Sequence, residues 1–271
     1  MFRRTGSPAA RHIIEPTSEP LVSFIFVTFG TDSAVIDAAL GRLISSCAAD
    51  DVLAEIIVVD NLHPKRGHAT GQHLGLTTSG VRLAMPDENL GFGGGNELGV
   101  AAARGSVLCL VNPDLMVNDG WLTPMLDELA AHPDDLIAPR LLAADGSLDE
   151  AGQWVGPNGL TAPASGADID YASAACWMLR TETHERVGGF DPRFHPAYFE
   201  DVDFAFRLRR LGGRVRIHPT VAVTHLRGGS VGRVHGPTDI SKQLHAFVEL
   251  WADELWRQPP IGVRRVIAAA S

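Results

Sequence analysis

Residues 187–213 read VGGFDPRFHPAYFEDVDFAFRLRRLGG. The second half of this stretch predicts a helix, because Phe204, Leu208 and Leu211 recur at the spacing of one helical face. Acidic residues crowd its first turn and arginines its last, which is the charge order that a helix dipole favours, and two glycines provide a left-handed stop. Because a carboxylate on a first turn is held rigidly, we expect chemistry at the end formed by residues 200–203.

The chain before this stretch alternates apolar runs with helical patterns. We expect buried strands at Leu21–Phe29, Glu55–Asp60, Val81–Met85, Ser106–Val111, Leu136–Ala138 and Ala172–Leu179. Helical patterns cover residues 33–47, 96–104 and 121–131, and the loop 62–80 leaves room for a short helix. This alternation predicts an α/β sheet with right-handed crossovers. Ligands bind such sheets at the carboxyl ends of the strands, where Phe29, Asp60 and the turn 112–114 fall.

The remaining segments have weaker patterns. Residues 141–170 predict loops with a short strand near 153–155. Two short strands, 214–217 and 221–225, are expected on either side of Pro219, followed by a mobile glycine-rich loop, 227–237. A helix from about 238 to 256 should close the chain, with 258–271 trailing from it.

The composition limits the classes of function. A net charge of −9 over 271 residues argues against nonspecific nucleic-acid binding, so an anionic substrate would need a local positive device such as a metal ion or a helix N-terminus. The three cysteines are far apart and lie in or next to apolar runs, which favours buried free thiols in a reducing compartment. No run reaches about 18 apolar residues, so no membrane span is expected, and peripheral attachment stays open. Residues 1–20 lack an apolar core segment and predict a flexible leader.

Several motifs have two interpretations. Asn112-Pro113-Asp114 is either a turn that ends a strand or a metal or diphosphate site, for which Asp114 offers a hard oxygen ligand. Asp60 is either a cap or an acceptor for a base or ribose, and Phe29 is either core or a stacking platform. Residues 89–96 fail the dinucleotide fingerprint and predict a glycine-lined backbone against a ligand. Trp177 fits a core position better than an acceptor platform.

Taken together, these residues resemble the inverting glycosyltransferase family 2, with the GT-A fold, and within it the bacterial rhamnosyltransferase-type branch. The resemblance runs from about residue 21 to 230 and is carried by Val22–Gly30, Ile56–Asn61, Asn89–Gly99, Leu110–Asp114 and Val187–Asp203 with His225. It implies a Rossmann-like, mostly parallel twisted sheet flanked by helices, with a small C-terminal helical extension. The implied domain is 21–230, with a nucleotide-binding half (21–115) and an acceptor or catalytic half (116–230), and residues 231–271 form a loop and helix that pack on it.

The resemblance also implies roles for individual residues. Asp201 matches the general base, with Glu200 as its acidic neighbour. Asp114 and His225 match the ligands of Mg²⁺ or Mn²⁺, although Asn112 stands at the first position of the family's D-x-D. The residues implied in binding the nucleotide-sugar are Thr28, Phe29, Asp60, Asn89, Gly91, Phe92, Asn96, Asn112 and Trp177.

The implied reaction moves a sugar from a nucleoside diphosphate to an acceptor hydroxyl with inversion, because one base serves a single displacement. dTDP-rhamnose is the donor implied by the branch, and UDP-sugars stay open. A glycan, a glycolipid or a small molecule is implied as acceptor, in cell-wall or polysaccharide biosynthesis, in the cytoplasm or at the inner face of the membrane.

Two rival functions are weighed from the sequence. A sugar nucleotidyltransferase would carry a basic glycine-rich loop after the first strand, and residues 28–33 contain no basic residue. A non-catalytic carbohydrate-binding protein would not need Asp114, Asp201 and His225 together.

Overall fold

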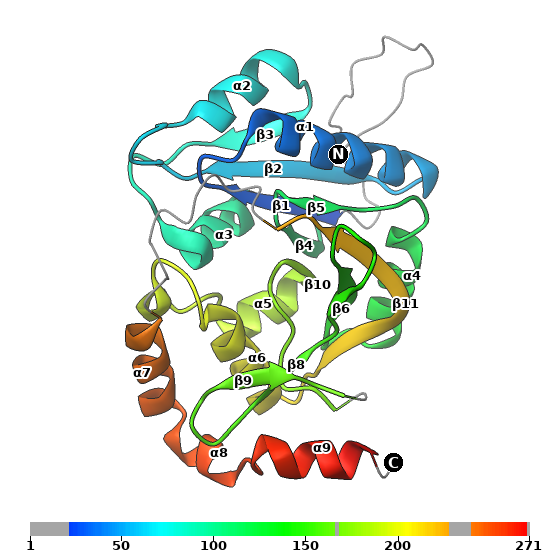
Figure 1. Ribbon diagram of the computed structural model, residues 1–271. Helices are drawn as coiled ribbons and strands as arrows, with labels where there is room; N and C mark the ends of the chain where they lie inside the picture. The colour runs from blue at the N-terminus through cyan, green and yellow to red at the C-terminus, as the bar shows by residue number, and fades with distance from the viewer. Residues whose placement is uncertain (1–21, 166–167, 228–239, 270–271) are drawn as a thin grey trace.

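The computed structural model describes residues 22–165, 168–227 and 240–269. Its centre is a nine-stranded sheet with the order β3-β2-β1-β4-β10-β6-β11-β5, in which β7 pairs with β6 (Figure 1). The first half of the sheet is parallel throughout and contains β1 (Val22–Thr28), β2 (Ala54–Asp60), β3 (Val81–Ala84) and β4 (Val107–Val111). These strands lie where the apolar runs predict them.

The second half of the sheet is mixed. β10 (Cys176–Arg180) runs antiparallel between β4 and β6 (Leu136–Leu142). β11 (Val215–His225) is parallel to β6, and it pairs antiparallel with the two residues of β5 (Leu115–Met116). The short β7 (Leu148–Glu150) extends from β6, while β8 (Gln153–Val155) and β9 (Thr161–Pro163) form a separate hairpin. The predicted α/β architecture is therefore confirmed, with parallel pairing concentrated in the first half.

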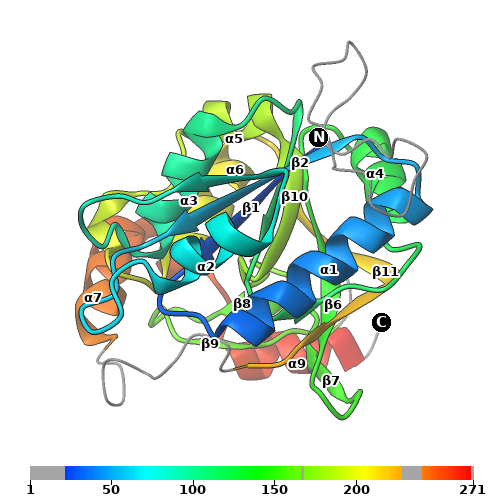
Figure 2. The same ribbon diagram turned by 90° about the horizontal axis from the view of Figure 1, so that it is seen from above.

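Two apolar cores lie on opposite faces of this sheet, because side chains alternate along buried strands. On one face, Phe24 and Phe26 of β1 pack with α1 (Ser33–Ala49) and α4 (Leu122–Ala131). On the other face, Ile25 of β1 packs with α5 (Thr181–Val187), α6 (Glu200–Arg210), α7 (Ser241–Leu250) and α8 (Ala252–Arg257). Figure 2 shows α1 and α6 on different sides of the sheet. α1 begins as predicted, since Asp32 accepts a hydrogen bond from the backbone N–H of Ala34.

The helix expected over 96–104 begins earlier, because α3 (Gly91–Ala102) already includes the glycines at 91 and 93–95. A Cβ atom at Gly95 would lie 2.7 Å from Val27, and one at Gly99 would lie 2.4 Å from Ile25. The glycines therefore let the helix approach β1 closely. Because these glycines have no side chains, they allow close packing of the helix on β1, and they would equally allow a ligand to approach the backbone.

Three further expectations are corrected. The two strands predicted around Pro219 are one strand, β11, whose pairing with β6 shifts register between Ile217 and Ala222. Leu211 is 48% exposed rather than part of the buried helix face. The single helix expected over 238–256 is two helices, α7 and α8, and the expected trailing end contains a further helix, α9 (Ile261–Ala269). Pro259-Pro260 explains the last break, because proline lacks the N–H that a continuous helix needs.

The expected leader, 1–20, and all but the first residue of the glycine-rich loop 227–237 lie outside the described residues. Cys47, Cys109 and Cys176 are buried free thiols, as predicted. No helix in the described ranges is long and apolar enough to cross a membrane.

Candidate active site

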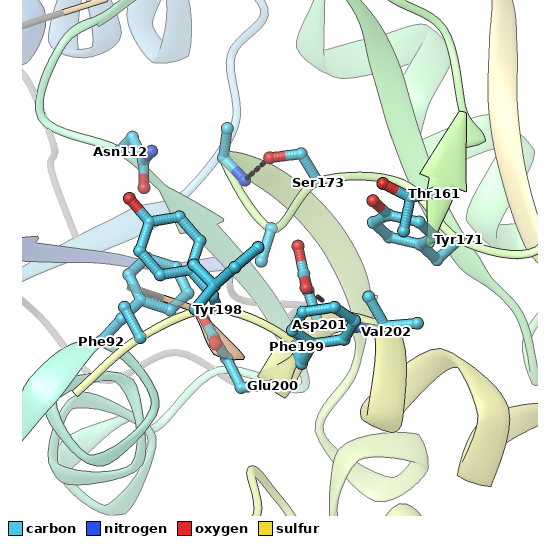
Figure 3. Close-up of a pocket in the computed structure, with 14 residues that line it drawn as sticks. Phe92, Asn112, Thr161, Tyr171, Ser173, Tyr198, Phe199, Glu200, Asp201 and Val202 are labelled. Atoms are coloured by element: carbon cyan, nitrogen blue, oxygen red, sulfur yellow. Dashed lines mark hydrogen bonds between the residues drawn. The ribbon is translucent and has the colours of Figure 1, made fainter. Parts of the chain in front are cut away.

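The first turn of α6 opens onto a cavity of about 390 Å³. Asp201 lines this cavity together with Tyr198, Phe199 and Glu200. Tyr198 and Phe199 have φ angles of 79° and 69°, a region that costs free energy for residues other than glycine. The turn is held because the buried ring of Phe199 packs on Phe247 of α7, with 5.3 Å between ring centroids. Figure 3 shows the Asp201 carboxylate pointing into the cavity.

Burial, and to a smaller extent the nearby Glu150 carboxyl, raise the pKa of the Asp201 carboxyl to about 6. Hydrogen bonds from backbone N–H groups, including that of Val202 at 2.9 Å, act in the opposite direction. A carboxylate with a pKa near 6 is ionised at neutral pH and still a competent proton acceptor. Asp201 therefore has the properties of a general base.

Glu200 is more deeply buried, and it differs from Asp201 in protonation. Burial and then the charge of Asp201 hold the pKa of Glu200 well above its ordinary value. Its Oε2 atom has no hydrogen-bond partner among the described residues. Two adjacent carboxyl groups with separated pKa values can act differently at one pH, so Asp201 is the candidate base and Glu200 its neutral neighbour.

Asp114 and His225 lie together at the sheet edge. The Nε2 atom of His225 is 3.3 Å from Oδ1 of Asp114. The pairing of β5 with β11 fixes this position, because the backbone N–H of Leu226 donates to the carbonyl of Asp114 at 3.0 Å. The Nδ1 atom of His225 is buried without a hydrogen-bond partner in the described ranges, and it lies 3.8 Å from the Asp149 carboxylate.

This donor set fits a divalent ion in part. Adjacent ligands bound at about 2.1 Å and at right angles are separated by about 3 Å, close to the distance between Asp114 and His225. Among the residues that the structure describes, no group of three His, Cys, Asp or Glu side chains gathers as a metal site. The pair would therefore supply two ligands, and a diphosphate or water would supply the others.

Asn112 belongs to the cavity that contains Asp201, two residues before Asp114. Its backbone N–H donates to the carbonyl of Ala175 at 2.8 Å, which fixes the end of β4 beside the cavity wall. In Figure 3 the ring of Tyr198 extends from the start of α6 toward Asn112. The structure thus brings Asn112 and the acidic end of α6 to one cavity.

Part of the wall was not singled out in the sequence. Thr161, Tyr171 and Ser173 line the cavity beside Asp201 (Figure 3). Glu150 of β7 accepts a hydrogen bond from the backbone N–H of Ser173 at 2.7 Å, and burial raises its pKa. Glu150 and Thr161 lie in the segment 141–170, which has no clear periodicity, so their polar side chains are the only signal that the sequence offers there.

The residues of β1 and β2 that are expected to bind the nucleotide lie deeper in the protein than the cavity wall. Asp60 is fully buried and accepts hydrogen bonds from Thr28 Oγ1 and from the backbone N–H of Gly71, both at 2.7 Å. These bonds link β1, β2 and α2 (Ala69–Thr77), so Thr28 and Asp60 have structural partners. The ring of Phe29 is half-buried and packs on His63, with 4.7 Å between ring centroids.

The residues expected at the start of α3 are engaged within the protein. Asn89 accepts a hydrogen bond from the backbone N–H of Gly91 at 2.9 Å. Gly91 has a φ of 72°, and a Cβ atom there would lie 2.4 Å from the carbonyl oxygen of Pro196. Asn96 is buried and donates to the carbonyl of Phe92 at 3.0 Å, and of these four residues Phe92 lines the cavity.

Trp177 does not line the cavity. Its side chain is fully buried, its Nε1–H donates to the carbonyl of Ala172 at 3.1 Å, and its ring stacks on Phe190. The core position favoured by the sequence pattern is therefore confirmed.

Comparison with known proteins identifies the family of the chain. The family model for glycosyl transferase family 2 matches residues 23–188, which is more than half of the chain. The chain belongs to glycosyl transferase family 2. Among curated members and relatives, the pre-mycofactocin glycosyltransferase of Mycobacterium tuberculosis is 30% identical over 140 residues, covering 47% of this chain and 28% of that protein. The chain spans between 26% and 45% of the length of the curated relatives that it matches here.

Solved glycosyltransferases share the fold. A crystal structure of GalNAc-T7 with UDP, GalNAc and Mn²⁺ has a TM-score of 0.72 and 16% identity, covering 87% of this chain and 49% of that one. The mannosyltransferase PcManGT from Pyrobaculum calidifontis, in complex with GDP-Man and Mn²⁺, has a TM-score of 0.60 and 15% identity. That match covers 98% of this chain and 72% of the mannosyltransferase. At these identities the similarity establishes the fold, which is GT-A.

Proposed function

We propose that this protein is an inverting glycosyltransferase that uses Asp201 as general base to activate an acceptor hydroxyl. The observation that carries the proposal is the Asp201 carboxylate in the cavity wall, with a pKa raised to about 6. Membership of glycosyl transferase family 2 supports a nucleotide-sugar as donor. The complexes of structural neighbours with UDP or GDP-Man support the same donor class.

The metal ion proposed here is Mg²⁺ or Mn²⁺ held by Asp114 and His225. Such an ion, when bound, neutralises charge on the leaving diphosphate. The 3.3 Å separation of His225 Nε2 and Asp114 Oδ1 supports this role. Asn112, which joins this pair to the cavity, would contact the donor.

Residues of the chain orient the acceptor and accept its proton. The cavity walls hold the acceptor so that its hydroxyl lies between Asp201 and the anomeric carbon, since orientation converts an encounter into an intramolecular step. Asp201 accepts the hydroxyl proton as the new C–O bond forms and the bond to the nucleoside diphosphate breaks. A single displacement inverts the anomeric configuration.

We further propose dTDP-rhamnose as donor, with UDP-hexoses as the competing class, and a hydroxyl of a glycan, glycolipid or small molecule as acceptor. Tyr198 supports a sugar acceptor, because its ring is 49% exposed at the cavity and aromatic faces pack on the apolar faces of sugar rings. For Thr28, Phe29, Asp60, Asn89, Gly91 and Asn96, donor contact stays a prediction.

The proposal is tested by a thermal-shift screen of nucleotide-sugars with Mg²⁺ or Mn²⁺, because a ligand that binds the native state raises the melting temperature. One donor should give a metal-dependent shift, and the same donor should be consumed in a transfer or slow hydrolysis assay. If no nucleotide-sugar binds with or without metal, the proposed donor class is wrong.

His225→Ala tests the metal pair. This variant should lose most of the metal-dependent part of the shift, with a weakening of donor binding of about 10- to 100-fold. His73→Ala is the matched control, because His73 pairs with Asp37 on the surface, away from the cavity residues. Identical metal titrations of the His225→Ala variant and the wild type would remove His225 as a ligand.

A further inference from the structure

Helix α9 buries the charged residue Arg264 against the protein and exposes three aliphatic residues, Val263, Val266 and Ile267. Arg264 is buried, whereas Val263 is 49% exposed and Val266 is 71% exposed. An amphipathic helix on a protein in water normally has the opposite orientation, with its apolar stripe against the core. Figure 1 shows α9 at the periphery of the molecule, away from the central sheet.

The inward side of α9 is firmly attached. Arg264 forms an ion pair with the buried Asp170 and a second pair with Asp168 at 3.4 Å. Its guanidinium also lies 5.0 Å from the ring centre of Trp154. Asp170 also accepts a hydrogen bond from Arg209 of α6 at 2.7 Å. Because Arg264 makes these contacts, the outward direction of Val263 and Val266 follows from the fold and not from loose attachment.

The charge of this region is opposite to that of the rest of the chain. After Glu254 the sequence holds Arg257, Arg264 and Arg265 and no acidic residue, although the chain as a whole carries a net charge of −9. Arg265 is exposed beside Val266 and forms no ion pair with a described residue. Trp256, at the end of α8, is 87% exposed. Tryptophan, arginine and aliphatic residues exposed together are typical of a segment that lies in a membrane interface.

We propose that Trp256 and the outward side of α9 bind the surface of an anionic lipid bilayer. Val263, Val266 and Trp256 would enter the boundary between headgroups and acyl chains, and Arg257 and Arg265 would contact lipid phosphates. Ile267, which is 60% exposed, adds to the apolar surface. A second copy of the chain fits less well, because a two-fold contact through this surface would bring Arg265 toward its own copy.

This surface is connected to the cavity described above. Asp170, which holds Arg264, directly precedes Tyr171 in the cavity wall. A bilayer bound at α9 would therefore have a fixed orientation relative to the cavity. The inference does not depend on the reaction that the cavity performs, and its test requires no activity.

The experiment is co-sedimentation of the full chain with vesicles of phosphatidylcholine alone or with about 30% phosphatidylglycerol. The wild type should bind the anionic vesicles at least tenfold more tightly, and the binding should weaken as salt is raised. Val266→Ser and Arg265→Gln should each weaken it at least threefold with unchanged melting temperature, because both side chains are exposed. Leu76→Ser is the matched control, since Leu76 is an 89% exposed residue on α2.

A second readout uses tryptophan fluorescence. The other four tryptophans, Trp121, Trp154, Trp177 and Trp251, are at most 3% exposed, so a vesicle-induced blue shift reports Trp256. The shift should occur with anionic vesicles and vanish in Trp256→Phe. The proposal is overturned if the wild type does not bind anionic vesicles, if the variants bind like the wild type, or if the blue shift is absent. It is also overturned if this surface instead mediates a dimer that Val266→Ser disrupts.

Discussion

At the scale of single residues, the two adjacent carboxyl groups at the start of α6 have different environments. Asp201 reaches the cavity and receives backbone hydrogen bonds that favour its charged form, whereas Oε2 of Glu200 is buried with no partner in the described part of the chain. The negative charge of Asp201 also raises the pKa of Glu200, which separates the two pKa values further. Adjacent positions on one helical turn thereby provide a base and a neutral acid at neutral pH.

This difference predicts how the two residues respond to amide substitution. Asp201→Asn should reduce transfer by about 10²- to 10⁴-fold with little change in donor binding, because the amide cannot accept the proton. Glu200→Gln should retain most of the activity, since an amide resembles a protonated carboxyl. For the wild type, kcat/KM should fall below a pH of about 6, where Asp201 becomes protonated.

Initial rates between pH 4.5 and 8.5, with the donor found by the screen, provide the measurement. Full transfer by the Asp201→Asn variant would exclude Asp201 as the base. An acid limb unchanged in Glu200→Gln would assign the titration to Asp201.

The same carboxyl should make stability depend on pH. Burial raises the native pKa of Asp201 above its unfolded value of about 3.9, so its contribution favours the native state at low pH and is lost as the pH rises through about 6. Asp201→Asn should therefore stabilise the protein at pH 8, by a free energy of unfolding on the order of 2 kcal/mol, and change it little at pH 4.

Urea denaturation at the two pH values measures this effect. Asp191→Asn is a control of opposite sign, because hydrogen bonds from Arg193 hold the pKa of Asp191 below its ordinary value. That variant should lose stability at pH 8. Equal stability of wild type and Asp201→Asn at pH 8 would contradict a buried, charged Asp201.

At the scale of elements, α3 and the turn before α6 depend on close backbone contact. The backbone N–H of Phe92 donates to the carbonyl of Pro196 at 2.7 Å, directly beside Gly91. This contact connects the helix start to the turn that carries Tyr198 and Asp201. A glycine with a positive φ is required at position 91 both by the backbone and by the neighbouring carbonyl.

Gly91→Ala should therefore destabilise the protein by at least about 2 kcal/mol, combining backbone strain with overpacking. Gly120→Ala is the matched control, since Gly120 has a similar φ of 76° and a Cβ atom added there would meet no heavy atom within 4 Å. Gly120→Ala should reduce the free energy of unfolding by only about 1 kcal/mol. Chemical denaturation of both variants gives the difference, and equal losses would mean that the Pro196 contact is easily relieved.

At the scale of the whole molecule, a buried and an exposed polar contact both connect α6 to the C-terminal helices. Asp203 is fully buried, accepts a hydrogen bond from Trp251 Nε1–H at 2.9 Å and pairs with Arg207 at 2.7 Å. Glu254 pairs with Arg210 at the surface. These contacts connect the same elements and differ in their exposure to water.

Asp203→Ala should reduce the free energy of unfolding by about 3–5 kcal/mol, because it leaves the Trp251 N–H and the Arg207 charge without their buried partner. Glu254→Ala should cost less than about 1 kcal/mol, since an exposed ion pair contributes little. Urea titration monitored by near-ultraviolet circular dichroism tests both. Similar losses would show that burial does not distinguish the two contacts.

The sheet order also brings distant segments to the candidate site. Asp114 directly precedes β5 and His225 ends β11, and these strands are neighbours in the sheet although 111 positions separate the two residues in the chain. β7 places Asp149 near His225, and it places Glu150 next to Ser173 and the cavity. The cavity wall thus comes from segments on both sides of β10.

Local sequence patterns predicted much of this arrangement. The apolar runs specified the buried strands, and the charge order of residues 200–210 specified α6 with its acidic first turn, because these features depend on neighbours within a few residues. The boundaries of α3 were not predictable in this way, since its glycines are tolerated only because β1 lies against them. The orientation of α9 was equally inaccessible, because the ion pair of Arg264 with Asp170 joins residues 94 positions apart.

The sequence by itself determined an α/β domain with a carboxylate-bearing helix start, and it pointed to Asn112, Asp114, Asp201 and His225 as candidates. Only the tertiary structure decided that Asn112 and Asp201 line one cavity, that Asp114 and His225 form a pair, and that Thr161, Tyr171 and Ser173 complete the wall. The physical reason is that periodicity records which side of an element is buried. Which elements meet, and how deeply a carboxyl is buried between them, depends on packing between segments far apart in the chain.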